Sequence, residues 1–222
     1  MSFSVVIVAG GSGKRFGSKQ PKQFLLLNKK QMFLWSVIAF KKLKECKQII
    51  LVVPEDKIKF MQKYKKIYGL DIVCGGKERY DSVKNGLKYV KDSIDFVAIH
   101  DGARPLITSE IIKKVLTAAV RYGAAIAASV AKDSIKFSKD GKKIIKSIDR
   151  NTIWQAQTPQ IFKTKILKKV YSKKIPKTIT DDSQLVEKSG KKVMLVDAGY
   201  ENFKVTHPMD FKLAELILKK RN

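Results

Sequence analysis

Short apolar runs alternate with amphipathic stretches along most of the sequence, and this alternation constrains the fold more than any other feature. Strand-like runs are expected at residues 4–9, 49–53, 71–74, 95–99, 124–130 and 192–196. Helical spacing of apolar residues is expected at residues 32–43, 55–68, 81–90, 109–122, 164–171, 181–188 and from Pro208 onward. Strands that alternate with helices build βαβ units. The sequence therefore predicts an α/β fold with a mostly parallel sheet.

One segment breaks this alternation. Between residues 132 and 148, apolar side chains flank the turn Lys139-Asp140-Gly141, and an Asp-Gly pair favours a tight β-hairpin. We predict a hairpin arm, about residues 132–152, that projects from a single domain covering residues 1–222. A chain of 222 residues is long enough for one sizeable core, and the sequence contains no repeat or linker that would divide it.

The balance of charge is strongly basic. The chain has 46 Lys and Arg against 20 Asp and Glu, a formal net charge of +26. Proteins that bind nucleic acid gather such charge into patches and use arginine forks with interleaved aromatic residues. Here 40 of the basic residues are lysines that are spread almost evenly, which is typical of solvated helix faces and loops. We expect no nucleic-acid partner, although a basic nucleic-acid-binding protein stays an alternative.

Membrane and secretory signals are not found in the sequence. No apolar run approaches the roughly 18 residues that a membrane span needs, and the N-terminal stretch lacks the basic segment and cleavage site of a signal peptide. The two cysteines, Cys46 and Cys74, are too few for a disulfide framework. The sequence predicts a cytoplasmic protein without a membrane partner.

A glycine-rich segment, Ala9-Gly10-Gly11-Ser12-Gly13-Lys14-Arg15-Phe16-Gly17, follows the first expected strand. Glycines at this place let backbone N–H groups approach an anion closely, and Arg15 and Lys22 add full positive charges. The spacing is that of neither a Walker A loop nor a complete dinucleotide fingerprint. We predict phosphate binding here, with a tight turn and exposed bases as the alternative.

Two further segments follow strands at the same edge of the predicted sheet. Gly75-Gly76-Lys77-Glu78-Arg79, with Ser82 after it, is either a turn into a helix or a set of backbone groups that reads a base edge. Asp101 ends a buried strand, where a carboxylate can hold Mg²⁺ together with substrate oxygens; a loop cap is the alternative. His100 is expected to be a hydrogen-bonded structural histidine.

The third group of candidates lies in the C-terminal half, at 149–150, 157–160, 180–182 and 203–208. Thr180 is a plausible helix N-cap, which would explain its place without a function. Lys204 lies in an extended, otherwise apolar stretch, which favours a functional role over a solvated one.

The six arginines are informative because the chain uses lysine by default. Arg15, Arg79, Arg104 and Arg150 lie in segments marked by Gly, Pro or Asp, whereas Arg121 and Arg221 lie in lysine-rich helical stretches. An arginine offers a planar fork that lysine does not. We expect the first four to have geometric roles and the last two to have none.

The candidate residues suit one class of chemistry. Two histidines and two cysteines build no catalytic triad and no metal cluster. Phosphate binders, one metal carboxylate and polar positioning groups suit phosphoryl or nucleotidyl transfer, where catalysis consists of positioning and charge stabilisation.

Taken together, the motifs resemble a known family. The motifs are A-G-G-S-G-K-R-F-G with P-K-Q, G-G-x-E-R-x-x-S-V, H-D-G-A-R-P, D-R-N, Q-T-P-Q-x-F, T-D-D and N-F-K-V-T-x-P-x-D. They resemble those of the 2-C-methyl-D-erythritol 4-phosphate cytidylyltransferases, from about Phe3 to Leu218.

The resemblance implies a Rossmann-like nucleotidyltransferase fold and a homodimer joined through the hairpin arm. It implies that CTP and 2-C-methyl-D-erythritol 4-phosphate, with Mg²⁺, give 4-diphosphocytidyl-2-C-methyl-D-erythritol and pyrophosphate in non-mevalonate isoprenoid synthesis. The implied nucleotide-binding residues are Ala9, Gly10, Gly11, Gly13, Gly76, Arg79 and Ser82. The implied catalytic residues are Arg15, Lys22 and Lys204, and the implied metal ligand is Asp101. The implied acceptor-binding residues are Arg104, Ser134, Arg150, Thr158, Thr180 and Lys204. Of these, Arg150 and Ser134 would serve the partner subunit's site.

Departures from the family pattern are modest. Gly10 and Gly102 stand where the family usually has alanine, and Ser134 stands where threonine is common. Ribitol-5-phosphate cytidylyltransferase shares the motifs on the CTP side and is the nearest alternative. Asp149-Arg150-Asn151 favours the methylerythritol phosphate enzyme. A third alternative is an interaction module without turnover, which any CTP-dependent activity would exclude.

Overall fold

Seven strands form one sheet in the computed structural model of the chain, which describes residues 1–11, 16–17, 21–176 and 178–221. The strands are β1 (Phe3–Val8), β4 (Cys46–Val53), β5 (Asp71–Cys74), β6 (Phe96–Asp101), β7 (Ala124–Val130), β10 (Trp154–Lys163) and β11 (Met194–Asp197). Their order across the sheet is β11-β7-β10-β6-β1-β4-β5. The pairs of β10 with β6 and β7 are antiparallel, and the other pairs are parallel. The predicted α/β fold with a mostly parallel sheet is confirmed.

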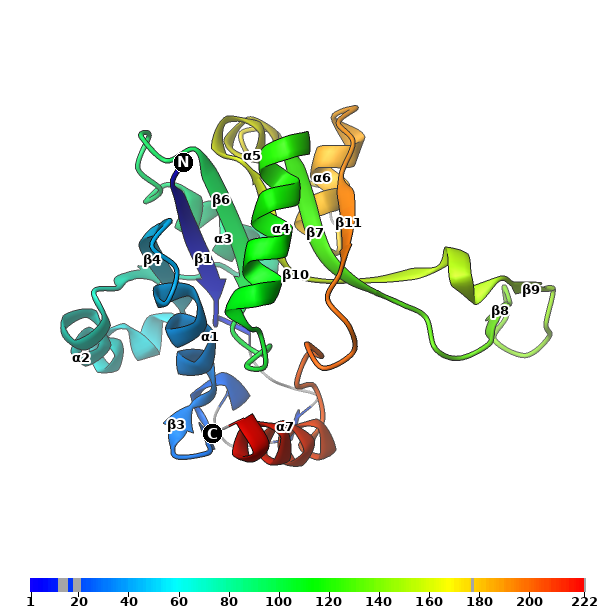
Figure 1. Cartoon of the computed structure of the whole chain (residues 1–222), viewed down its shortest axis with the longest axis horizontal. Helices are drawn as coiled ribbons and strands as arrows, with labels where there is room; N and C mark the ends of the chain where they lie inside the picture. Colours follow the sequence, from blue (N-terminus) through cyan, green and yellow to red (C-terminus); the bar gives the residue numbers. More distant parts are fainter. Residues whose placement is uncertain (12–15, 18–20, 177, 222) are drawn as a thin grey trace.

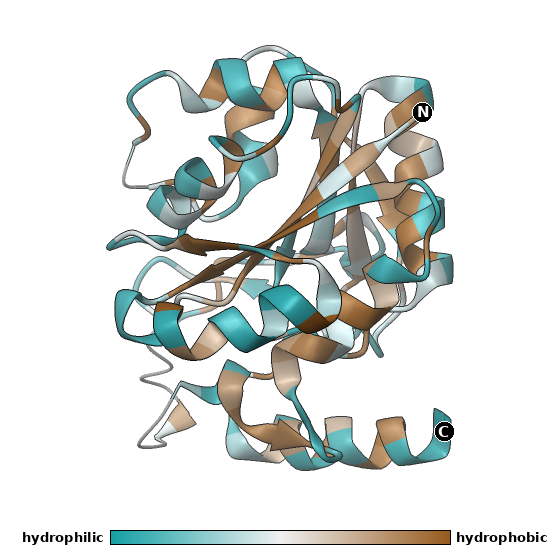
Figure 2. Cartoon of the chain, turned by 90° about the vertical axis from the view of Figure 1, so that its left-hand side faces the viewer, coloured by the Kyte–Doolittle hydropathy of each residue, from teal (hydrophilic) through white to brown (hydrophobic). Residues whose placement is uncertain are grey.

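Helices cover both faces of this sheet (Figure 1). One face packs against α1 (Met32–Lys41), α2 (Ile58–Tyr68) and α4 (Ser109–Tyr122). The other face packs against α3 (Arg79–Leu87), α5 (Thr164–Tyr171) and α6 (Asp182–Lys188). Because successive side chains of a strand point to opposite faces, Val5 of β1 joins the first core and Val6 joins the second, and both are fully buried. Figure 2 shows the apolar strands enclosed between helices with polar outer faces.

A smaller layer closes the structure beyond one edge of the sheet. The C-terminal helix α7 (Pro208–Arg221) packs on the short hairpin of β2 (Leu26–Leu27) and β3 (Lys30–Gln31). Leu27, Leu106, Val205 and Leu218 belong to the apolar cluster between them. Three short 3₁₀ helices, η2 (Lys22–Phe24), η3 (Glu55–Lys57) and η4 (Arg150–Thr152), lie in the connections. None of the helices among the described residues is long and apolar enough to span a membrane.

The predicted hairpin is present and projects away from the body of the molecule (Figure 1). It pairs β8 (Ile135–Phe137) with β9 (Lys146–Ile148) in antiparallel register. At the turn, the Asp140 carboxylate accepts hydrogen bonds from the backbone N–H groups of Lys142 and Lys143, and Gly141 has a positive φ of 71°. The turn therefore uses an Asp-Gly pair as expected, with the aspartate closing it through its side chain.

Two local expectations were wrong. No strand was expected at residues 157–160, but they lie in β10, in the middle of the sheet. The ladder between β10 and β7 is irregular between Ala156 and Gln160, so Pro159 lies where a missing backbone donor is tolerated. Asp181, not Thr180, caps α6, because its carboxylate accepts the N–H of Gln184. Helix α4 is capped by Thr108, whose hydroxyl accepts the N–H of Ile111.

The strand order places a crevice at the carboxyl ends of β1 and β6. The chain runs from β1 to β4 and β5 on one side and then returns to β6 on the other side. Ligands of open α/β sheets bind at such a reversal of strand order. Val8, the last residue of β1, is the register partner of Asp101, the last residue of β6. The end of β1 and the carboxylate of Asp101 therefore lie next to each other.

Candidate active site

A cleft of about 410 Å³ opens at the carboxyl ends of β1 and β6. It collects side chains and backbone from four segments of the chain that are far apart in sequence. Its lining includes eight of the predicted site residues: Gly10, Gly11, Lys22, Gly76, Arg79, Ser82, Asp101 and Lys204. Ala9 is buried directly before Gly10. Gly13 and Arg15 lie outside the described residues.

The glycine loop after β1 is held by a side chain that sequence reasoning missed. The buried amide of Gln23 donates to the backbone carbonyls of Ala9 at 2.6 Å and of Gly11 at 2.7 Å. These two hydrogen bonds hold the backbone of Ala9 and Gly11 at the edge of the cleft. Lys22 lies beside Gln23 in η2, is 8% exposed and lines the same cleft.

The segment before α3 forms the opposite wall. A capping box closes this helix, since Glu78 and Asp81 exchange hydrogen bonds between their side chains and backbones. The hydroxyl of Ser82 accepts the N–H of Gly76 at 3.1 Å. A Cβ atom at Gly76 would stand 2.2 Å from Cβ of Asp81, so this turn requires glycine for lack of space. The segment leads into α3 and lines the cleft, and the reading of a base edge by its backbone groups stays a prediction.

Asp101 is the charged centre of the cleft. One carboxylate oxygen pairs with Nζ of Lys204 at 2.7 Å, and the other pairs with Nε of Arg79 at 3.2 Å. Burial alone would raise the pKa of Asp101, but the positive charges of Arg79, Lys204 and Arg104 hold it well below its usual range. The carboxylate is therefore ionised at any physiological pH, and it gathers three cations around itself.

His100, next to Asp101, has the structural role that was expected. Its ring is fully buried, with Nδ1 3.1 Å from the hydroxyl of Thr158 and Nε2 3.1 Å from the hydroxyl of Ser36. Burial lowers its pKa to about 3, so the ring is neutral. The hydroxyl of Thr158 also accepts the N–H of Asp101 at 3.0 Å. Thr158 thus fixes the backbone of Asp101, and it lines a second cavity as well.

This second cavity, of about 270 Å³, shares Arg79, Asp101 and Lys204 with the cleft. Its other lining residues are Arg104, Ala156, Gln157, Thr158, Gln160, Thr180 and Asp181. Three predicted acceptor residues, Arg104, Thr158 and Thr180, therefore meet here. Arg104 donates to the carbonyl of Asn202 at 2.8 Å. Its buried Nε has no hydrogen-bond partner among the described residues.

A buried amide network supports the second cavity and was not predicted. Asn202 is fully buried and donates to the side chain of Gln157 at 2.8 Å and to the carbonyl of Thr158 at 2.9 Å. Gln157 donates to the hydroxyl of Ser129 and to the carbonyl of Gly199. Buried amides that are paired in this way rigidify a wall. In the sequence, Asn202 and Gln157 were marked only by their positions in the motifs. Their polar character did not indicate burial, because polar residues also occur in exposed loops.

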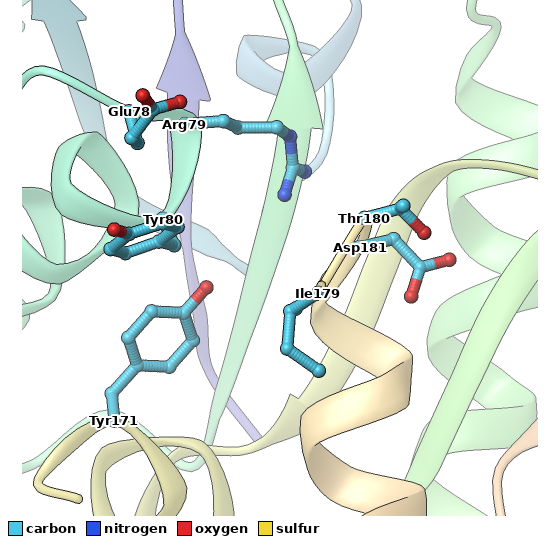
Figure 3. A pocket seen from close by; sticks show the side chains of 7 residues that line it. All are labelled: Glu78, Arg79, Tyr80, Tyr171, Ile179, Thr180 and Asp181. Atoms are coloured by element: carbon cyan, nitrogen blue, oxygen red, sulfur yellow. The ribbon is translucent and has the colours of Figure 1, made fainter. Parts of the chain in front are cut away.

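A third cavity, of about 240 Å³, lies behind Arg79 (Figure 3). Figure 3 shows Tyr80 and Tyr171 on one side, Ile179 and Thr180 on the other, and the side chain of Arg79 reaching between them. Arg79 therefore borders all three cavities.

Two predicted site residues do not join the others within one chain. Ser134 precedes β8 and Arg150 begins η4 after β9, and both are exposed. The guanidinium of Arg150 donates to the carbonyl of Lys132 at 2.7 Å at the root of the arm. Neither residue lines the cleft or the two cavities beside it.

The donor set of the cleft suits one kind of metal ion. Among the described residues there is no group of three or more His, Cys, Asp or Glu that could hold a metal on its own. Mg²⁺ does not require such a cage, because it is commonly bound by one or two carboxylates and by substrate phosphates. Asp101, ionised beside a glycine loop, offers one such carboxylate, so the residues present fit Mg²⁺ that arrives with a phosphorylated substrate.

The arrangement can bring two anionic substrates together. The cleft and the second cavity meet at Asp101, Arg79 and Lys204, so ligands in the two spaces would face each other across these charges. The side chains described there include no cysteine and no base–nucleophile pair for covalent catalysis. What they provide is charge and position, which is the requirement of phosphoryl and nucleotidyl transfer.

Comparisons with known proteins agree with this chemistry. A model of the 2-C-methyl-D-erythritol 4-phosphate cytidylyltransferase family matches residues 3–220. The protein of that name from Endomicrobium trichonymphae is 51% identical over 220 residues, which cover 99% of this chain and 100% of that protein. The one from Alkaliphilus oremlandii is 41% identical, over 98% of this chain and 95% of that protein.

Solved structures of similar proteins have the same fold. The 2-C-methyl-D-erythritol 4-phosphate cytidylyltransferase of Thermus thermophilus has a TM-score of 0.82 at 30% identity and covers 99% of this chain and 100% of its own. The 4-diphosphocytidyl-2C-methyl-D-erythritol synthase of Anaerococcus prevotii has a TM-score of 0.84 at 28% identity and covers 98% of both chains. The likeness therefore extends over the whole structure, including the segments that form the cleft.

Proposed function

Since the chain belongs to the 2-C-methyl-D-erythritol 4-phosphate cytidylyltransferase family, we propose how its two adjoining cavities divide the reaction between them. The enzyme transfers the cytidylyl group of CTP to 2-C-methyl-D-erythritol 4-phosphate and releases pyrophosphate. We assign the cleft of about 410 Å³ to CTP and the second cavity to the acceptor. The observation that supports this division is that Asp101, Arg79 and Lys204 line both spaces.

The nucleotide is proposed to lie along the glycine loop. Backbone groups of Ala9, Gly10 and Gly11, with Gly13 beyond the described part of the loop, receive the phosphates. The base and ribose lie against Gly76, Arg79 and Ser82, which together line this wall of the cleft. Lys22 faces the same cleft, and with Arg15 it stabilises the negative charge that spreads over the α-phosphate during transfer.

The acceptor is proposed to lie between Arg104, Thr158 and Thr180, with its phosphate toward Lys204. An oxygen of that phosphate attacks the α-phosphorus of CTP, the new P–O bond forms, and the bond to the β-phosphate oxygen breaks. Pyrophosphate leaves with the electron pair of that bond. The attacking phosphate is already ionised, so no general base is required.

Asp101 is proposed to hold Mg²⁺ against the triphosphate. The ion supplies charge neutralisation at the phosphates when it is bound. In the structure both oxygens of Asp101 are paired with cations. Asp101 would hold the ion, and Lys204, which lines both spaces, would offer its ammonium group to the phosphates beside it.

A second copy of the chain is proposed to complete the acceptor site. The arm of β8 and β9 projects away from the body of the molecule (Figure 1). Ser134 and Arg150 flank its two strands, and the arm exposes Phe137, Ile144 and Ile145. An exposed apolar hairpin favours burial against a partner. In a homodimer joined through this arm, Arg150 would offer its fork to the acceptor phosphate in the site of the other copy.

A cytoplasmic location is proposed on the state of the cysteines. Both Cys46 and Cys74 are free thiols, and burial raises the pKa of Cys46 to about 12. Cys74 is also exposed, and exposed free thiols are typical of a reducing compartment such as the cytoplasm.

The acceptor is tested by measuring pyrophosphate release from CTP and Mg²⁺ with either 2-C-methyl-D-erythritol 4-phosphate or ribitol 5-phosphate. We expect kcat/KM to be at least about 100-fold higher with the methylerythritol phosphate, because two well-placed contacts discriminate by that order. Equal or higher kcat/KM with ribitol phosphate would overturn the assignment of the acceptor.

A matched variant tests the placement of CTP in the same assay. Lys22→Ala should lower kcat by about two to three orders of magnitude, the typical effect of losing one charge-stabilising donor. The unfolding midpoint should change little, because Lys22 lies at the wall of the cleft and outside the apolar clusters. An unchanged kcat would contradict the role of Lys22.

A further inference from the structure

Arg79 is held between two carboxylates, one at the end of a strand and one at the start of a helix. Its Nε pairs with Asp101 at 3.2 Å, at the end of β6, and its Nη2 pairs with Asp182 at 2.8 Å, at the start of α6. Asp101 belongs to the site already described, but Asp182 lines neither the cleft nor the second cavity. Asp182 therefore contacts Arg79 from outside the two spaces that are assigned to the substrates.

Asp182 is itself fixed by several contacts. Its side chain is fully buried, and the hydroxyl of Tyr171 donates to its other oxygen, Oδ1. Its backbone N–H, like that of Ser183, donates to the side chain of Gln160 in β10 at 3.0 Å. A buried carboxylate with this many partners has one position.

The hydroxyl of Tyr171 is suited to donate a hydrogen bond at every physiological pH. It is the last residue of α5 and is 3% exposed. Burial raises the pKa of Tyr171, and the neighbouring carboxylate of Asp182 raises it further. The hydroxyl keeps its proton at any physiological pH, so the hydrogen bond to Asp182 does not depend on pH.

The position of Arg79 matters because its guanidinium borders all three cavities. Lys204 and Arg79 both pair with Asp101, so a guanidinium without a second anchor would be free to collapse onto Asp101. Asp182 draws one edge of the planar fork away from Asp101 and sets its orientation. Tyr171 in turn occupies the oxygen of Asp182 that Arg79 does not use.

We infer that Tyr171 and Asp182 are positioning residues that act on catalysis through Arg79, by fixing its guanidinium at the junction of the nucleotide cleft and the acceptor cavity. This inference rests on the proposed placement of CTP against Arg79. It adds two residues, neither of which touches substrate, to the machinery of the reaction.

The test is a double-mutant cycle between Tyr171→Phe and Arg79→Lys, with kcat/KM for CTP as the readout. Tyr171→Phe in the otherwise unchanged enzyme should lower kcat/KM about tenfold, mainly through KM, because Arg79 loses its orientation. In the Arg79→Lys background the same change should lower kcat/KM less than about twofold, since there is no fork left to orient. Asp182→Asn keeps the shape of the side chain, removes its charge, and should show the same pattern.

Tyr80→Phe is the matched control. Tyr80 lines the same third cavity (Figure 3), and its hydroxyl makes no hydrogen bond to another described residue. Its kcat/KM should equal that of the unchanged enzyme. Unfolding midpoints of all variants, followed by circular dichroism, separate loss of fold from loss of positioning.

Different failures would have different meanings. An equal loss of kcat/KM from Tyr171→Phe in both backgrounds, or no loss in either, would overturn the positioning role while leaving the nucleotide site intact. An unchanged kcat/KM in Arg79→Lys alone would overturn the proposed contact between Arg79 and CTP, and the positioning role with it. If the Tyr171→Phe variant does not fold, Asp182→Asn replaces it in the cycle. A loss of kcat/KM that is larger in the unchanged background than in Arg79→Lys would support the positioning role, and an equal loss would overturn it.

Discussion

At the scale of single residues, the site depends on which titratable side chains are charged and which are neutral at physiological pH. His100 and Asp101 are neighbours in β6, and burial affects them in opposite ways. Burial lowers the pKa of His100 to about 3, whereas three cations hold the pKa of Asp101 well below its usual range in spite of burial. The result is a neutral imidazole behind an ionised carboxylate, so the negative charge of this wall is concentrated on Asp101.

The neutral state of His100 predicts a pH dependence of stability. The unfolded chain takes up a proton at histidine as the pH falls through about 6.5, but the folded chain does not until about 3. The free energy of unfolding should therefore decrease as the pH falls, with His100 contributing about 2 kcal/mol between pH 7 and pH 5. Urea unfolding at both pH values measures this difference.

His100→Gln is the control for this measurement. The variant is expected to be less stable at both pH values, but its loss between pH 7 and pH 5 should be smaller by about 2 kcal/mol. Asp101 does not interfere, because the stability that its lowered pKa contributes is lost only below about pH 4. The same pH slope in both proteins would show that His100 is not held neutral by the fold.

Two glycines of the cleft differ in the space around them, which gives a second prediction. Gly76→Ala should cost about 1–3 kcal/mol of unfolding free energy and raise KM for CTP, because its Cβ would stand 2.2 Å from Asp81. Gly10→Ala should be neutral or stabilising by up to about 1 kcal/mol, because its Cβ would meet Ser82 Oγ at an ordinary 3.5 Å. Urea unfolding and steady-state kinetics measure both effects, and equal losses in the two variants would contradict this account.

Part of the site could be predicted from residue types in segments that contain Gly, Pro or Asp. Glycines after a buried strand, an aspartate at a strand end and Lys204 in an apolar stretch indicated segments of the cleft, and the resemblance to the family completed the set of eight predicted residues that line it. The residues that hold the site residues in place could not be predicted in this way. Gln23, Asp182 and Asn202 act through buried hydrogen bonds to segments far away in the chain, and a sequence without the fold does not show which polar residues become buried.

At the scale of elements, the hydrophobic period predicted most helices and strands but missed β10. The ranges 71–74, 109–122, 124–130 and 164–171 coincide with β5, α4, β7 and α5. Strand β10 contains Pro159 and five polar residues among its ten, so neither its period nor its composition was that of a central strand. Its polar residues Gln157 and Gln160 face buried partners instead of water, which is a tertiary effect.

The arm allows a prediction about assembly. Replacing its exposed apolar residues, Phe137, Ile144 and Ile145, by serine should convert a homodimer into a monomer at micromolar concentration, because the arm would have no apolar surface to bury. Sedimentation velocity measures the mass. The unfolding of the monomer should remain cooperative, since these residues belong to none of the apolar clusters. An unchanged dimer would contradict the role of the arm.

At the scale of the whole molecule, a few of the basic residues behind the net charge of +26 line the cleft and the second cavity. Lysines and arginines around Asp101 line the spaces assigned to CTP and the acceptor. The many other lysines, for example Lys59, Lys84 and Lys139, are exposed on helices and loops. The few cations that serve the reaction are those that the fold brings to the carboxyl ends of β1 and β6.

The most direct test of the account is whether one active site contains Lys22 of one copy and Arg150 of the other. Lys22→Ala and Arg150→Ala are co-expressed with different affinity tags, and the doubly tagged dimer is purified and assayed for pyrophosphate release from CTP and 2-C-methyl-D-erythritol 4-phosphate. Each variant alone should be nearly inactive. The mixed dimer should recover about half of the unchanged activity, because one of its two symmetry-related sites is complete. A mixed dimer as inactive as its parents would contradict a site built from two copies.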